Sequence, residues 1–134
     1  MDTQVSTQNQ LAALLITQDI TAVPFSNHVV FHDFAQDCLV KGREAVTAVL
    51  HAFFQTAFSN PTITLNRTQA NAESIRLAFV LAGQQVAPFW GLPCTGRSVT
   101  LEMELGCRFL GEQITHVDLH YDAGALLRQL GLAL

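Results

Sequence analysis

The feature that most constrains the fold is a run of strict alternation between apolar and polar side chains over residues 99–109. The apolar members occupy every second position: Val99, Leu101, Met103, Leu105, Cys107 and Phe109. Successive side chains of a β-strand point to opposite faces of its sheet, so this pattern predicts a long strand with one buried and one polar face. Other elements must then cover the apolar face of the sheet.

Further strands are expected on both sides of this one in the sequence. They are residues 27–34, a segment around Ile63 and Leu65, residues 75–81 and residues 114–121. A tight turn is expected at Gly111 and Glu112, between the last two strands. Short turns between consecutive strands predict antiparallel pairing.

Three helices are expected around the sheet. The first spans about residues 6–18, and the second spans about residues 42–58 with an apolar stripe at helical spacing. A short last helix contains Leu126 and Leu127, with Asp122 as its N-cap. Helices followed by a meander of strands are typical of an α+β fold, and residues 1–134 are expected to form one such domain.

Composition excludes several classes of function. The net charge is −4 and basic residues do not cluster, so neither nucleic acid nor an anionic membrane is expected as a partner. The N-terminus is unlike a signal peptide and no apolar run is long enough to span a membrane, which predicts a cytoplasmic protein. Cys38, Cys94 and Cys107 show no disulfide or metal-ligand spacing, so no metal is expected.

Three segments resemble the SnoaL-like polyketide cyclases. They are VVFHDFAQDCLVKGREAVTAVLHAFFQTAF (29–58), APFWGLPCTGRSVTL (87–101) and DAGALLRQLGL (122–132), and the first also resembles ketosteroid isomerases and limonene epoxide hydrolase. The resemblance implies a cystatin-like cone of the nuclear-transport-factor type, with a curved antiparallel sheet wrapped around N-terminal helices and an apolar pocket. It also implies a homodimer formed through the sheet. The implied activity is cofactor-free acid/base chemistry, such as isomerisation, cyclisation or hydration, on a small apolar molecule of the polyketide or terpenoid kind.

The chain departs from the cyclases at two positions that carry their chemistry. SnoaL-like cyclases carry a catalytic His on the long strand and a catalytic Asp on the last strand, and these positions align with Leu105 and Leu119. Leucine cannot transfer a proton, so a non-catalytic binding protein for a small apolar ligand stays open as an alternative. Alternation predicts that Leu119 and Tyr121 face inward while Asp118 faces outward. A shift of one residue along the strand would reverse these orientations and bring Asp118 inward.

Asp33 is the main catalytic candidate that remains. It follows Phe31 and His32 in a motif whose aspartate takes a proton from carbon in ketosteroid isomerases, and it shares strand parity with Phe31. Asp33 either faces the pocket as a desolvated general base or caps the turn after its strand. Tyr121 is expected to donate a hydrogen bond to a developing oxyanion. Asp122 is a third candidate, although capping of the last helix also explains its position.

The expected ligand pocket is lined by apolar side chains. Phe89 and the lone tryptophan, Trp90, form an aromatic loop that either closes one end of the pocket or fills the edge of the sheet. The full predicted set is Phe31, Phe54, Phe89, Trp90, Leu105 and Leu119. A further alternative is a dimeric accessory protein whose cavity is filled by its own phenylalanines.

Overall fold

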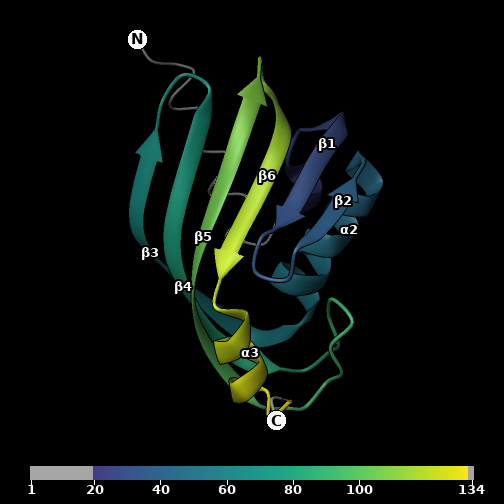
Figure 1. The fold of residues 1–134 in the computed structure, drawn as a ribbon, viewed down its shortest axis with the longest axis vertical. Coiled ribbons are helices and arrows are strands. Elements are labelled where there is room, and N and C mark those ends of the chain that lie inside the picture. Colours follow the sequence, from purple (N-terminus) through teal and green to yellow (C-terminus); the bar gives the residue numbers. More distant parts are fainter. Residues whose placement is uncertain (1–19, 133–134) are drawn as a thin grey trace.

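The fold is built on a curved six-stranded sheet with helical segments packed against it (Figure 1). The computed structural model describes residues 20–132, so the helix expected at residues 6–18 lies outside the described residues. Along the chain the elements are η1 (Ile20–Ala22), β1 (Phe25–Asp33), β2 (Cys38–Lys41), α2 (Arg43–His51), η2 (Ala52–Thr56), β3 (Phe58–Ala70), β4 (Ser74–Gln85), β5 (Ser98–Leu110), β6 (Gln113–Tyr121) and α3 (Ala123–Gln129). None of the helices in this part of the chain is long and apolar enough to span a membrane.

The strands are arranged in the order β2-β1-β6-β5-β4-β3. Consecutive strands from β3 to β6 pair antiparallel, and β1 pairs antiparallel with β2. Short turns join β3 to β4 and β5 to β6, whereas a longer loop over residues 86–97 joins β4 to β5. The expectation of a purely antiparallel sheet is corrected at one place, because β1 pairs with β6 in parallel. Turn lengths constrain only strands that follow one another, and β1 and β6 are brought together by the rest of the fold.

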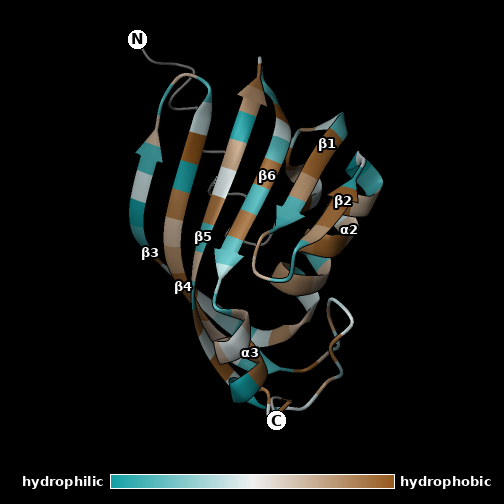
Figure 2. Cartoon of the chain, in the orientation of Figure 1, coloured by the Kyte–Doolittle hydropathy of each residue, from teal (hydrophilic) through white to brown (hydrophobic). Residues whose placement is uncertain are grey.

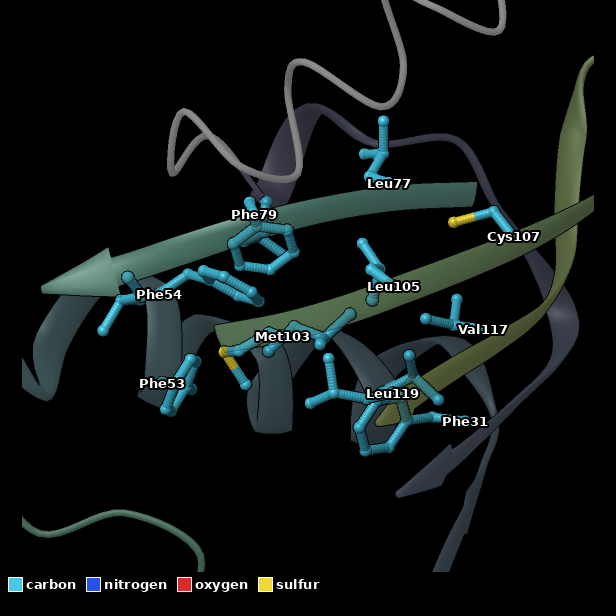
Figure 3. Packing of buried hydrophobic residues seen from close by; sticks show 14 of the residues in the cluster. Phe31, Phe53, Phe54, Leu77, Phe79, Met103, Leu105, Cys107, Val117 and Leu119 are labelled. Atoms are coloured by element: carbon cyan, nitrogen blue, oxygen red, sulfur yellow. The ribbon is translucent and has the colours of Figure 1, made fainter. Parts of the chain in front are cut away.

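The predicted orientation of the last two strands is confirmed by burial. Val117 and Leu119 are buried and His116 is exposed on the same strand. The apolar row of β5 is buried as well, so brown and teal segments alternate along the strands in Figure 2. In Figure 3 the inward side chains of β4, β5 and β6 gather between the sheet and the aromatic residues Phe53 and Phe54 of η2. This cluster is the hydrophobic core of the described residues.

One strand and one helix differ from the sequence expectation. The strand expected around Ile63 and Leu65 is the much longer β3, which runs through Pro61. Proline lacks a backbone donor but is tolerated on edge strands, and β3 is an edge of the sheet. The expected helix over residues 42–58 is α2 followed by the π-helical η2, after which the chain enters β3 directly.

The outer face of the sheet carries a connected set of charged side chains. Arg76 Nη2 lies 2.7 Å from Glu104 Oε2 and 3.0 Å from Asp118 Oδ1, which also contacts His120 Nε2 at 3.0 Å. Gly106 lies beneath this cluster, where a Cβ would be 2.7 Å from the Asp118 carboxylate. The hydrogen bond that Arg76 donates to Glu104 is the main cause that raises the pKa of Arg76. The side chains that share the Asp118 side of β6 therefore lie on the outer face of the sheet. The expected homodimer through this face stays a prediction.

Candidate functional site

A small pocket lies between the end of β1, the start of β2, α2 and the aromatic loop that connects β4 to β5. Its volume is about 170 Å³. The lining residues are Phe31, Asp33, Gln36, Cys38, Val40, Val49 and Trp90. Pockets for drug-sized ligands usually measure about 300–1,000 Å³, so this pocket suits a smaller molecule.

Asp33 is the last residue of β1 and is only 3% exposed. Its Oδ1 atom accepts hydrogen bonds from the backbone N–H groups of Ala35 (3.0 Å) and Gln36 (3.1 Å). Its Oδ2 atom accepts a hydrogen bond of 2.7 Å from the Tyr121 hydroxyl. The two sequence interpretations of Asp33 are therefore compatible, because one oxygen caps the turn while the carboxylate also lines the pocket.

Tyr121 connects the end of β6 to this carboxylate. Its hydroxyl donates to Asp33 and accepts a hydrogen bond of 2.5 Å from Gln36 Nε2. Burial is the main cause that raises the pKa of the Tyr121 phenol; Asp33 raises it further and Gln36 lowers it. The phenol is thus a stable donor, but in this arrangement its single proton is directed to Asp33 rather than to the expected oxyanion.

Trp90 forms an aromatic wall of the pocket. Its indole Nε1 donates a hydrogen bond of 3.0 Å to the backbone carbonyl of Val49 in α2. The indole stacks on Phe53 at a centroid distance of 4.5 Å, and its ring lies 6.5 Å from Phe31 and 6.1 Å from Tyr121. The π-helical segment that carries Phe53 follows Val49 closely, and such segments are frequent at functional sites. The indole is therefore held at both its nitrogen and its face.

Gln85 fixes the loop that carries Trp90, and no sequence pattern pointed to it. Its side-chain Nε2 donates to the carbonyls of Ala87 (3.2 Å) and Pro93 (3.0 Å). Its Oε1 accepts from the Thr95 backbone N–H at 2.9 Å and from the Thr95 hydroxyl at 3.0 Å. Gln85 is only 1% exposed, so four polar partners depend on one buried amide.

We expect Gln85→Leu to lower the free energy of unfolding by about 2–4 kcal/mol, because it leaves several buried polar groups without a partner. Urea denaturation measures this change, and the single tryptophan reports the loop directly by fluorescence. The matched control is Gln84→Leu, since Gln84 is the exposed neighbour and a surface substitution usually changes stability by less than about 0.5 kcal/mol. Equal effects of the two variants would contradict the role assigned to Gln85.

The other predicted site residues are not among those that line this pocket. Four of them belong to the buried core: Phe54, Phe89, Leu105 and Leu119. Asp122 is exposed and accepts a hydrogen bond of 3.0 Å from the Ala125 backbone N–H, which confirms it as the N-cap of α3. The ligand-binding and catalytic roles of these five residues stay predictions. Of the remaining candidates, Phe31, Asp33 and Trp90 line one pocket, and Tyr121 donates a hydrogen bond to Asp33.

Sequence reasoning missed the β2 side of the pocket. Gln36, Cys38 and Val40 line it, and Cys38 lies directly opposite Asp33 in the β1–β2 register. A signal was present in the alternation of Cys38 and Val40, but a strand of four residues is too short to stand out by periodicity. Within residues 20–132 no group of three or more His, Cys, Asp or Glu side chains is placed to hold a metal ion.

Comparison with known proteins identifies a family that matches this chain. The model of the family described as SnoaL-like polyketide cyclase matches residues 7–130. A search of curated protein sequences gave no significant match.

Solved structures share the fold at low sequence identity. A protein of Jannaschia sp. CCS1 assigned as a SnoaL-like polyketide cyclase has a TM-score of 0.83 at 14% identity, covering 100% of this chain and 98% of its own. TsrD from Streptomyces laurentii has a TM-score of 0.77 at 19% identity, covering 99% of both chains. A ketosteroid isomerase-like protein of Catenulispora acidiphila, solved in complex with trimethylamine, has a TM-score of 0.69 at 20% identity, covering 99% of this chain and 96% of its own. The chain belongs to the SnoaL-like polyketide cyclase family.

Proposed function

We propose that this protein converts a small, largely apolar molecule by cofactor-free acid/base chemistry, with Asp33 as the base. The observation that carries the proposal is a carboxylate that is 3% exposed, lines a pocket and is held by three hydrogen-bond donors. General bases in enzymes are fixed in this way, because proton transfer requires a defined direction of approach. Membership of a small-molecule cyclase family supports the same class of reaction.

The hydrogen bonds indicate which oxygen takes the proton. A carboxylate oxygen has about two acceptor positions, and Oδ1 of Asp33 already accepts from two backbone N–H groups. Within the part of the chain that the structure describes, Oδ2 accepts only from Tyr121, so it keeps capacity for a proton from carbon. In the proposed step the C–H bond breaks, its proton moves to Oδ2, and its electron pair moves into an adjacent carbonyl to form an enolate.

Tyr121 acts after proton transfer, when the negative charge has passed from Asp33 to the enolate oxygen of the substrate. Hydrogen bonds to an ionised acceptor are stronger than those to a neutral one, so protonation of Asp33 weakens the bond from the Tyr121 hydroxyl. The phenol proton is then free to turn toward the new enolate oxygen. Return of the proton from Asp33 to a different carbon completes an isomerisation, and attack of the enolate on a second carbonyl gives a cyclisation.

The size of the pocket limits the substrate. A volume of about 170 Å³ equals about six water molecules at about 30 Å³ each. This space suits a compound with one ring or its equivalent rather than a fused four-ring skeleton. The proposed substrate is therefore a small carbonyl compound with an acidic C–H group.

Solvent hydrogen exchange tests the proposal before the product is known. A panel of one-ring ketones and enones is incubated with the protein in D₂O, and deuterium at carbon is measured by NMR or mass spectrometry. We expect protein-dependent incorporation next to the carbonyl of at least one compound, with an ionisation in the pH–rate profile. Exchange that proceeds equally well with folded Asp33→Asn would exclude Asp33 as the base.

A non-catalytic binding protein is the second candidate, and one observation favours it. Leu105 and Leu119 pair directly across β5 and β6 and have no exposed surface. The sequence resemblance aligns these two leucines with the acid and base of the cyclases. Tight binding of a ligand that gains no deuterium would favour this candidate over the enzyme.

A further inference from the structure

Among residues 20–132, the Asp33 carboxylate has no positive partner. Its three hydrogen-bond donors are two backbone N–H groups and a phenol, which are all neutral. Within residues 20–132, the ion pairs of Lys, Arg and His side chains go to Asp37, Glu104 and Asp118, and none goes to Asp33. Buried charges in proteins are usually paired, because an isolated charge away from water is unfavourable. A ligand that carries the missing positive charge would satisfy this carboxylate.

The walls of the pocket favour such a ligand. Phe31 and Trp90 line it, and the Tyr121 ring lies 6.1 Å from Trp90. Aromatic faces attract organic cations, and tryptophan does so most strongly. The other polar lining groups are the amide of Gln36 and the thiol of Cys38, and no basic residue is among the lining residues. Asp33 therefore sets the charge of the pocket, which disfavours anions.

We propose that this pocket binds a compact organic ammonium ion, with its nitrogen facing Asp33 and its carbon groups packed on Phe31 and Trp90. A pocket of about 170 Å³ accommodates a substituted ammonium group with a short apolar extension. The inference rests on the proposed function only in placing the ligand in the same pocket, and it narrows the substrate class to a small molecule that carries an amine. Such a ligand presents its apolar part to Val40 and Val49.

Choline and 3,3-dimethylbutan-1-ol form a matched pair of probes, because they differ only in a charged nitrogen in place of a neutral carbon. The anion 3,3-dimethylbutanoate completes the series. Trp90 is the single tryptophan and lines the pocket, so its fluorescence reports binding of each probe. We expect choline to have a dissociation constant at least about tenfold lower than that of the neutral alcohol. The anion should bind no better than the alcohol.

Two variants assign this preference to one carboxylate. In Asp33→Asn the ratio of the two dissociation constants should move several-fold toward one, because the charge is removed and most of the shape is kept. Only the smaller preference of the aromatic faces for a cation remains. Asp37→Asn is the matched control on the same turn, since the Asp37 side chain is 95% exposed and contacts His32. This control should keep the tenfold preference of the wild-type protein.

Equal affinity of wild-type protein for choline and the alcohol, or no binding of choline, would overturn the inference. Wild-type protein alone decides this point, so the test stands even where Asp33→Asn does not fold. A tenfold preference that survives undiminished in folded Asp33→Asn would also overturn it. The deuterium-exchange experiment is independent of this binding experiment. If Asp33→Asn loses exchange while the wild-type protein shows no preference for choline, Asp33 is supported as the general base and the ammonium ligand is rejected.

Discussion

Replacing Asp33 by Asn should lower the rate of deuterium incorporation into the substrate by about 10²–10⁴-fold, the usual contribution of a general base. Asparagine keeps a side-chain oxygen that can accept from the Ala35 and Gln36 backbone N–H groups, so the turn after β1 should survive. The amide nitrogen that replaces Oδ2 cannot take a proton from carbon. We therefore expect a large loss of rate with little change in melting temperature.

The control for this experiment lies four residues further along the chain. Asp37→Asn removes the same charge from the same turn, but the Asp37 side chain is exposed and faces His32. Its exchange rate should stay within about twofold of wild type, because a surface charge at this distance is largely screened by solvent. An Asp33→Asn protein that is folded and retains the wild-type rate would show that the carboxylate only caps its turn.

The sheet could be predicted from the sequence because its signals are local. The alternation over residues 99–109 places Leu105 inward in β5, and the same argument orients Leu119 in β6. The burial of both residues confirms this argument. The parallel pairing of β1 with β6 was not predictable in the same way, because it joins segments that no short turn connects.

The site was predictable only in part, because its geometry depends on contacts between distant segments. Asp33 and Tyr121 are 88 residues apart and meet through the β1–β6 pairing. Each was a candidate by its own strand parity, but their hydrogen bond could not be inferred from parity. Gln36 is placed by a turn, and Gln85 acts through the carbonyls and N–H groups of a loop. Neither residue type has a periodicity that would reveal such a role.

Leu119→Asp places an acid at the position that the sequence resemblance aligns with the catalytic Asp of the cyclases. It should lower the free energy of unfolding by more than about 4 kcal/mol. Leu119 has no exposed surface and pairs with Leu105 across the sheet, so the substitution removes core packing that is usually worth about 2–5 kcal/mol. It also buries a second carboxylate beside Asp33, which is the partner of Leu119 in the β1–β6 register. Two neighbouring carboxylates disfavour the ionised form of one another.

Two further substitutions separate the effect of charge from the effect of lost packing. Leu119→Ala should lower stability by about 2–5 kcal/mol, and His116→Asp, on the exposed face of the same strand, should change it by less than about 0.5 kcal/mol. Urea denaturation of the three variants at neutral pH and again near pH 4 measures the stability lost through packing and the stability lost through the buried charge. The destabilisation by Leu119→Asp should decrease at the lower pH, where its carboxyl group is protonated. A Leu119→Asp protein more stable than Leu119→Ala would contradict the packed environment of this position. The expected order instead means that the packed site of Leu119 disfavours an acid beside Asp33, which is the one buried acidic residue within residues 20–132.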